Sequence, residues 1–498
     1  MLILASATIP KVLVSILITL TVTLLLKYFW NRRWLYYYAA KLPGPLAWPL
    51  LGNGLAFRQG RNEFYYQLLR HIDVNPTVFR LWFGPYLHII TSRPKDADQL
   101  LTNFLEKSSF FRYGDMCFGN GLVTSKVDVW RGRKKMIIPT FNQKILNSYT
   151  DALQKHSKRF VSDVERSYDG NSIQLLPKIW NHALNGFCET FADIDADLVV
   201  GQDQYLTNVR RFEELVLERC LKPWLYPNFT FKHSPLGKET TKLSENIWPF
   251  VTQLMNLKKM TLCDNSDDDL KKKRHLNHLF SLLAEKYMEE EDVAAELQNM
   301  ILASTETTSY SSGFTFLALA MHPEIQKNVQ NELDSIFGTS DRDITLEDVI
   351  NMEYLERVIK ESLRLFPSVP FVMRNMDKTI EIDSHVFPAG ADIVVAIMNI
   401  HMRPDLWPDP WKFDPDRFLP EETEKRHRCA FMPFGHGSRV CAGVKMAMTM
   451  MKITLSTLLR KYDVKPVSYK SLKEIQLDYA VFMMPKDECQ VVLEKRKK

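Results

Sequence analysis

The sequence predicts a mainly helical protein with a small β region, an α+β fold, preceded by an N-terminal transmembrane helix. Three observations carry this prediction. An uncharged run rich in Val, Ile, Leu and Thr covers Val12–Leu26. Helical periodicity dominates residues 92 to 370, and strand-like segments lie before and after that stretch. Because strands and helices do not alternate, we expect a sheet built from distant segments rather than βαβ units.

The N-terminal segment is expected to anchor the chain in a membrane. With the apolar residues before Pro10, the run is about long enough to cross a hydrocarbon core of roughly 30 Å. A cleaved signal peptide is the alternative, but aromatic and basic residues such as Trp30 and Arg32 follow, not a small-residue cleavage site. Cations after the span favour a cytoplasmic body. We expect an anchor over 1–30, a basic, aromatic and proline-rich linker over 31–52, and one domain over 53–498.

Apolar and aromatic runs on either side of a turn predict the first strands. Val78–Phe83 and Leu87–Thr91 flank a Gly84–Pro85 turn and indicate a hairpin. Two further strands are expected at Thr379–Asp383 and Asp392–Ile397, and short strands after Val464.

One long helix is predicted from Asp292 to Met321, where proline is absent until Pro323. At 1.5 Å per residue it would be about 45 Å long. Its centre carries Glu306 among apolar and hydroxyl residues. A buried unpaired carboxylate is costly, so an exposed polar face is one interpretation and a functional acid is the other.

Composition and charge exclude several classes of protein. The 498 residues are 45% hydrophobic and 25% charged, which is ordinary for a globular chain and excludes wholesale disorder. The 64 Lys and Arg against 59 Asp and Glu give a net charge of +5, and the basic run 271–274 adjoins the acids 267–269 in what we interpret as a solvated loop. We therefore expect no nucleic-acid partner. The 7 cysteines form no CxxC pair, which indicates free thiols in a reducing compartment.

A single cysteine, Cys441, lies in a glycine-rich loop just before a helical run. Gly435, Gly437 and Gly443 allow tight turns and a close approach to something flat. Loop amides and the helix N-terminus are expected to lower the thiol pKa. Arg439 offers a charge suited to a carboxylate. Taken alone, the cysteine would more often be a buried structural thiol.

The whole pattern, Phe-x-x-Gly-x-Arg-x-Cys-x-Gly, resembles the cysteine loop of the cytochrome P-450 superfamily of haem-thiolate monooxygenases. This resemblance implies the P-450 fold for the body, haem b as cofactor and Cys441 as the axial ligand of its iron. The motifs and the acidic entry Glu289–Asp292 into the long helix are similar to the microsomal family-four clan, particularly its insect-type members.

Further motifs follow in the family's order. Glu361 and Arg364 share one helix face, and Phe413–Phe418 supplies Arg417. By itself the first pair could be a surface ion pair. In the family these three residues form a buried ion-pair network behind the haem loop, a structural role whose disruption strands a buried charge.

The resemblance also implies contacts with the haem. In the family a Trp and an Arg four residues later hold a propionate; here Trp130 is followed by Lys134, and Arg133 is a possible substitute. Ala303 stands where some fatty-acid hydroxylases of the clan carry a Glu that esterifies the haem, so we expect no covalent link. The implied set of cofactor-binding residues is Trp130, Arg133, Lys134, Ala303, Arg374, Phe434, Arg439 and Gly443.

The long helix resembles the family's oxygen-activating helix. Thr307 would face the bound dioxygen, and Glu306 would relay protons inward as the catalytic acid. Ser304 replaces the usual Gly, and its hydroxyl is expected to bond to the Met300 carbonyl.

The implied substrate is lipophilic, a fatty acid, a terpenoid or hormone, or a xenobiotic, because the candidate pocket is apolar. Several of these side chains could instead be plain core. The candidates are Phe110, Phe111, Tyr113, Met116, Met300, Ala303, Val369, Phe371, Val372, Val481 and Phe482.

The implied function is NADPH-fuelled monooxygenation at the endoplasmic reticulum membrane. A basic face of Arg131, Lys135 and Lys445 would dock NADPH–cytochrome P-450 reductase, with cytochrome b5 as a second candidate donor, although ordinary solvated charge is the alternative. A peroxide isomerase or dehydratase would not need Glu306 and Thr307. A haem-binding scaffold without catalysis would be expected to have a damaged cysteine loop or acid–alcohol pair.

Overall fold

The computed structural model describes residues 2–57, 61–262 and 274–497. Cys263 and the acidic run 267–269 lie outside these ranges, as does most of the neighbouring basic run. The described chain is mainly helical with a small β region, which confirms the fold class expected from the sequence.

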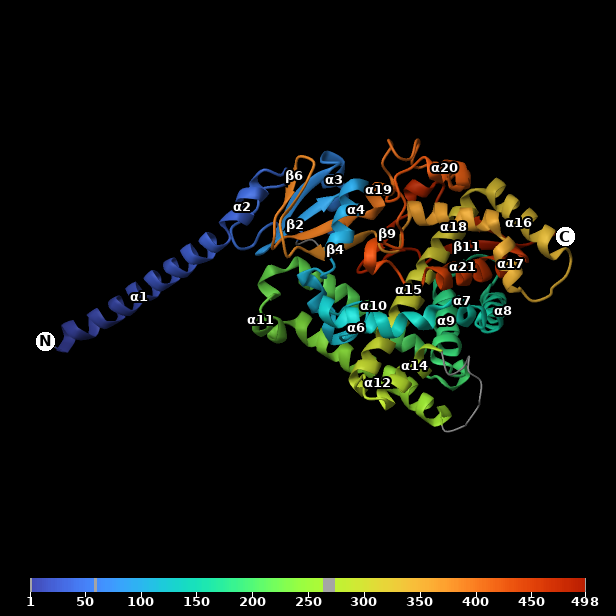
Figure 1. Cartoon of the computed structure of the whole chain (residues 1–498), viewed down its shortest axis with the longest axis horizontal. Helices are drawn as coiled ribbons and strands as arrows, with labels where there is room; N and C mark the ends of the chain where they lie inside the picture. The colour runs from blue at the N-terminus through green and yellow to red at the C-terminus, as the bar shows by residue number, and fades with distance from the viewer. Residues whose placement is uncertain (1, 58–60, 263–273, 498) are drawn as a thin grey trace.

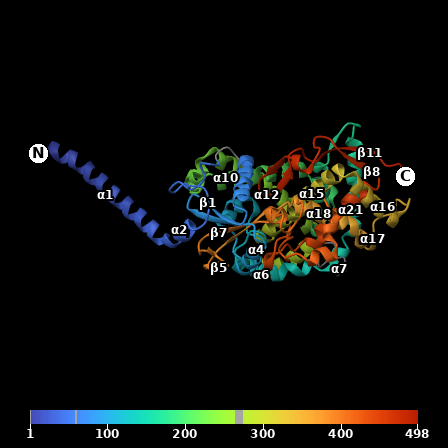
Figure 2. The ribbon, with the colours of Figure 1, turned by 90° about the horizontal axis from the view of Figure 1, so that it is seen from above.

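The first helix, α1 (Leu2–Asn31), projects from the body as a single rod (Figures 1 and 2). Its segment Val12–Asn31 has a mean hydropathy of 2.2 and is 0% buried by the rest of the molecule. By length and composition it could cross a membrane.

The next segment is more structured than the expected linker. It contains the short helix α2 (Arg33–Ala40), which the sequence did not predict. Tyr36 of α2 stacks on Trp82 with ring centroids 4.9 Å apart. The Arg80 N–H donates a 2.8 Å hydrogen bond to the Pro43 carbonyl. These contacts fasten the base of the projecting helix to the globular body.

The main sheet joins segments far apart in the chain. Its order is β1 (Val78–Phe83), β2 (Tyr86–Thr91), β7 (Asp392–Ala396) and β4 (Phe371–Asn375). The β1–β2 hairpin is antiparallel, which confirms the predicted hairpin. Strand β7 pairs parallel to β2 and antiparallel to β4. Nearly all residues of β1 and β2 and every residue of β7 are buried, so this part of the sheet is covered on both faces.

Three smaller sheets complete the β region. The predicted strand near residue 380 is β5, and its partner β6 was not predicted. The pairs and orders are β5 (Ile380–Ile382) with β6 (His385–Phe387), β9 (Leu477–Tyr479) with β10 (Met483–Pro485), and β3 (Ile173–Gln174), β11 (Gln490–Lys495) and β8 (Tyr462–Pro466).

The long helix α15 (Glu290–Met321) runs through the centre of the body (Figure 1), as the sequence predicted. A capping box of Glu289 and Asp292 begins it, and Pro323 follows its end. Most of its residues are buried by the helices around it. The other helices are α3 (Arg61–Val74), α4 (Pro94–Asn103), α5 (Asp115–Phe118), α6 (Val127–Ile137), α7 (Gln143–Asn147), α8 (Thr150–Ser167), α9 (Leu176–Phe187), α10 (Gln202–Leu221), α11 (Asn228–His233), α12 (Pro235–Leu262), α14 (His275–Ala284), α16 (Pro323–Phe337), α17 (Leu346–Asn351), α18 (Glu353–Leu365), α19 (Ile397–His401), α20 (Pro420–Glu424) and α21 (Val444–Leu459).

Candidate active site

The loop before α21 holds Cys441 in a constrained backbone. Gly435 and Gly437 have φ of +77° and +75°, a region that favours glycine. A side chain at Gly437 would also collide with the Leu101 carbonyl of α4. The Cys441 N–H donates a 3.0 Å bond to the Phe434 carbonyl and closes the loop.

The Cys441 side chain is exposed, yet burial raises the pKa of its thiol above the ordinary value. The sulfur is therefore accessible although dense protein surrounds it. The Gly443 N–H lowers the pKa, but burial has the larger effect. The expected lowering of the thiol pKa is therefore wrong for the metal-free chain. A bound metal ion deprotonates a coordinating thiol outright, so this thiol suits a ligand that ionises on binding.

A second thiol, Cys429, lies nearby in the chain but has a different environment. It is fully buried, and burial raises its pKa to about 12. Its Sγ lies with Asp98 and His436 in a cluster whose ligand atoms are within 4.8 Å of one another. Arg428 already bonds both oxygens of Asp98. Cys441 is therefore the accessible thiol of the two.

The centre of α15 presents a similar contrast. Ala303 is exposed and Thr307 half-buried, although most residues around them on α15 are buried. The two lie one turn apart on the same face, and the Thr307 hydroxyl donates a 2.8 Å bond to the Ala303 carbonyl. The Ser304 hydroxyl donates a 2.7 Å bond to the Met300 carbonyl, which confirms that expectation.

Glu306 points the other way. It is 2% exposed, which excludes the exposed-face interpretation. Tyr310 donates a 3.3 Å hydrogen bond to its Oε1, and burial raises the pKa of Glu306 to about 7. Such a carboxyl can both hold and release a proton near neutral pH.

Three cations gather without a counter-ion. Arg374 is 3% exposed, and its Nε has no hydrogen-bond partner. Arg439 donates to the Ser125 carbonyl at 2.8 Å, but its Nε and Nη1 have no partner. Lys107 pairs with Arg374 in an isolated antiparallel bridge. Among the described residues, none of the three forms an ion pair within 4.0 Å.

Burial and mutual repulsion act on this cluster. Burial, followed by the charges of Arg374 and Arg439, holds the pKa of Lys107 well below its usual value. Burial lowers the pKa of both Arg374 and Arg439 to about 10. Buried charges without partners are costly, so this arrangement fits an anionic group that enters from outside the chain.

The three α6 residues expected to contact the cofactor have different surroundings in the structure. The Trp130 ring has the Arg439 guanidinium 4.5 Å from its centroid and the Lys134 ammonium 5.0 Å from it. Lys134 also donates a 2.6 Å bond to the Ser438 carbonyl of the cysteine loop. Arg133 instead pairs with Glu296 at 2.7 Å and with Asp292, both on α15. Its charge is already compensated, so we remove Arg133 from the candidate propionate contacts.

Comparison with known proteins agrees with these features. The family model Cytochrome P-450 matches residues 42–493, nearly the whole chain. The chain belongs to the cytochrome P-450 family. It is 30% identical over 515 residues to cytochrome P-450 4c3 of Drosophila melanogaster, covering 97% of this chain and 93% of that protein.

Two further relatives have the same character. Cytochrome P-450 4c21 of Blattella germanica is 30% identical over 470 residues, or 92% of this chain and 93% of that protein. Cytochrome P-450 4V2 of Homo sapiens is 28% identical over 467 residues, or 90% and 89%. The resemblance to family four, insect members included, is confirmed.

Family membership makes the chain a monooxygenase that uses haem with a cysteine thiolate on the iron. The residues present fit that group. Haem carries two propionates, and the cations Lys107, Arg374 and Arg439 lack anionic partners. Lys107 was missed by sequence reasoning, because only the bridge to Arg374 brings it to the site.

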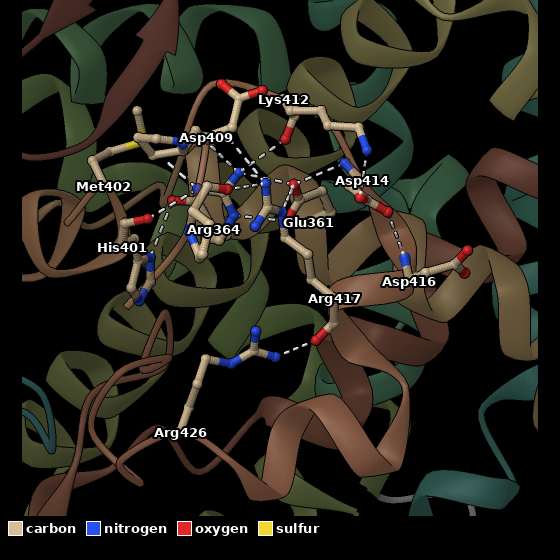
Figure 3. Close-up of polar contacts among 12 residues, drawn as sticks. Glu361, Arg364, His401, Met402, Asp409, Lys412, Asp414, Asp416, Arg417 and Arg426 are labelled. Atoms are coloured by element: carbon tan, nitrogen blue, oxygen red, sulfur yellow. Dashed lines mark hydrogen bonds and ion pairs between the residues drawn. The ribbon is translucent and has the colours of Figure 1, made fainter. Parts of the chain in front are cut away.

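Figure 3 shows the polar network around Arg364 and Glu361. Both side chains are fully buried, and two N–H groups of Arg364 bond the carboxylate at 2.7 and 2.8 Å. Arg417 Nε lies 3.5 Å from Glu361, and its Nη2 donates to the Pro408 and Asp409 carbonyls. The three residues named from the sequence thus lie together.

The network reaches the cysteine loop through His401, which sequence reasoning missed. Arg364 donates to the His401 carbonyl at 2.9 Å. The His401 ring lies between the Arg364 carbonyl, 3.1 Å from Nδ1, and the Met432 N–H, which donates to Nε2 at 2.9 Å. Burial lowers the pKa of His401 to about 3, so the ring is neutral and can accept at Nε2.

The candidate pocket residues fall into two groups. Half-buried or exposed positions remain candidates for contact with a substrate. The buried ones are Phe110, Tyr113, Met300 and Phe371; the half-buried or exposed ones are Phe111, Met116, Ala303, Val369, Val372, Val481 and Phe482. Phe110 and Tyr113 pack in an aromatic cluster with Tyr226, which favours a core role for them.

Replacing Glu361 by Gln is expected to destabilise the fold by about 3–5 kcal/mol, because it strands the buried charge of Arg364. Lys360→Gln on the same helix is the control. It removes a half-exposed ion pair with Glu356 and should cost less than about 1 kcal/mol. Denaturant unfolding of the two variants measures the difference; equal losses would contradict the prediction.

Proposed function

We propose that this chain is a membrane-anchored monooxygenase that takes NADPH-derived electrons from a reductase and inserts one atom of dioxygen into a lipophilic substrate. The observation that carries the proposal is a set of one buried and two half-buried cations without ion-pair partners among the described residues, together with an accessible thiol. Bound haem would supply the redox centre at which dioxygen is activated. The chain would supply an iron ligand in Cys441, charge partners for the propionates in Lys107, Arg374 and Arg439, and stacking support in Trp130.

Glu306 and Thr307 would control protons at this centre. Glu306 holds a titratable proton away from bulk water, one residue from the half-buried Thr307, which shares a helix face with the exposed Ala303. The Thr307 hydroxyl donates its proton to the Ala303 carbonyl, and its oxygen can still accept a hydrogen bond from a ligand on that side of α15.

The surface outside the cysteine loop suits an acidic electron donor. Arg131, Lys135 and Lys445 are exposed, and none forms an ion pair within the described residues. Electrostatic complementarity of this kind speeds encounter and orients partners. We assign this face to the diflavin NADPH–cytochrome P-450 reductase, with cytochrome b5 as a second donor.

The anchor and pocket support the remaining parts of the proposal. α1 is long and apolar enough to span a bilayer, and Arg32 and Arg33 follow it. By the positive-inside rule the body would be cytoplasmic, on the endoplasmic reticulum membrane. The half-buried apolar candidates Val369, Val372 and Phe482 suit a lipid, terpenoid, hormone or xenobiotic.

Exchanging the thiol tests the haem assignment. Cys441→His is expected to abolish the red-shifted Soret band of the reduced, carbon monoxide-bound protein, because the thiolate ligand is lost. Cys429→Ala is the control and should retain the band, since that thiol is enclosed. Retention of the band in Cys441→His, or its loss only in Cys429→Ala, would overturn the assignment.

The haem is expected to leave the chain completely in acidic organic solvent after turnover. An ester needs a free carboxylate, and Ala303 has none. On α15, Glu296 is paired with Arg133, and Glu306 is buried on a different helix face from Ala303. Haem staining of a denaturing gel measures this; stain that remains with the chain would contradict the expectation.

Deleting residues 1–31 is expected to move the protein from the carbonate-resistant membrane fraction toward the soluble fraction, because α1 is the described helix with a membrane-spanning composition. The carbon monoxide band should survive in the truncated protein. Substitution of Arg32 and Arg33 by Gln, which leaves the apolar run intact, is the control and should remain in the membrane fraction. Resistance of the truncated chain to carbonate would contradict the assignment of α1 as the anchor.

A further inference from the structure

A second buried carboxyl group meets Glu306. Glu213 of α10 is 2% exposed, and its Oε1 has no hydrogen-bond partner. The Oε2 of Glu306 is likewise without a partner. Each of the two carboxyl groups acts on the pKa of the other, so the two side chains are neighbours inside the core. Two carboxyl groups can share a hydrogen bond only when one of them carries a proton.

From this geometry we infer that Glu213 is a positioning residue that shares a proton with Glu306 and keeps that acid supplied during oxygen activation. The inference rests on the proposed function. It adds a residue on a different helix to the acid–alcohol pair, and no motif in the sequence points to that residue.

The environment supports proton sharing rather than an ion pair. Burial and the Glu306 charge raise the pKa of Glu213 well above its usual value. Cys117 and Tyr205 approach from α5 and α10, and Tyr310 from α15; their pKa values are also raised by burial. Near neutral pH these groups are neutral, so the pair keeps at least one proton.

A single cation lies between this pair and the surface. Arg210, three residues before Glu213, lowers the pKa of both carboxyls, whereas the neighbouring Glu214 raises that of Glu213. Arg210 donates to Glu488 at 2.8 Å and lies 3.6 Å from Asp478. Its side chain is 27% exposed and that of Glu488 is 25% exposed. Water at these groups offers a route by which the shared proton is replaced.

The proton balance says what the pair does. Monooxygenation consumes dioxygen, NADPH and one proton, with the substrate C–H becoming C–OH and the second oxygen atom leaving as water. If protons arrive too slowly, the same two electrons and two protons leave as hydrogen peroxide instead. A missing proton reservoir should therefore raise the share of peroxide.

Glu213→Gln tests this in full-length holoenzyme with reductase in lipid vesicles, with NADPH and dioxygen alone as probes. Gln keeps the shape and a donor but cannot pass on a proton. We expect the peroxide released per NADPH oxidised to rise several-fold, and its pH profile to change from two ionisations to one. Glu306→Gln should have a similar effect, and the double variant should be no worse than the more severe single variant, because both act on one route.

Glu218→Gln is the matched control. It makes the same change on the same helix, at a surface residue paired with Lys222, and should leave the peroxide share and pH profile unchanged. The carbon monoxide band, intact in all variants, separates failure of this inference from failure of the haem assignment.

A second readout does not depend on turnover. An infrared pH titration of protonated carboxyl groups should show a band in the wild type at pH 7 that Glu213→Gln removes. The inference is overturned if Glu213→Gln matches Glu218→Gln in peroxide share and pH profile, or if it removes no protonated-carboxyl band.

Discussion

The buried ion pair between Arg364 and Glu361 is the constraint on which the position of the cysteine loop depends. Two fully buried charges are tolerable only when their remaining hydrogen-bonding groups are also satisfied. Here Arg364 also donates to the His401 and Pro410 carbonyls, and Glu361 accepts from the Asp414 N–H. The pair therefore ties α18 to the long irregular segment after α19. Through the His401 ring and the Met432 N–H, that fixed segment sets where the loop carrying Cys441 begins.

The cations on the other side of the cysteine loop, unlike Arg364, have no anionic partners among the described residues. Lys107, Arg374 and Arg439 are brought together with backbone and ring contacts but without carboxylates, so their charges oppose folding of the chain alone. The buried Arg133, only three residues from Trp130, is different, because it forms ion pairs with two carboxylates of α15. Cations left without carboxylate partners in an otherwise compensated core are typical of functional sites. This arrangement means that haem would complete the charge balance of the core as well as supply its chemistry.

Sequence patterns predicted those features that depend on neighbours in the chain. The β1–β2 hairpin, the course of α15 and the Ser304–Met300 bond all follow from local spacing, and the structure contains them. What failed depends on distant segments. Arg133 was misassigned because its ion-pair partners lie on α15, far from it in the chain. Lys107 and His401 were missed because contacts between distant segments bring them to the site. The thiol pKa of Cys441 was predicted in the wrong direction because loop amides are visible in a sequence, whereas the burial that outweighs them is not.

The geometry of α15 explains how proton supply and the reacting centre can be kept apart. Consecutive residues on a helix point about 100° apart, so Thr307 is half-buried on the face of Ala303 while Glu306 is buried and bonded by Tyr310. A proton held by Glu306 thus lies behind the helix wall, in surroundings that keep the carboxyl neutral up to about pH 7. The same burial that raises the pKa of Glu306 keeps the proton on its carboxyl near neutral pH and out of contact with bulk water.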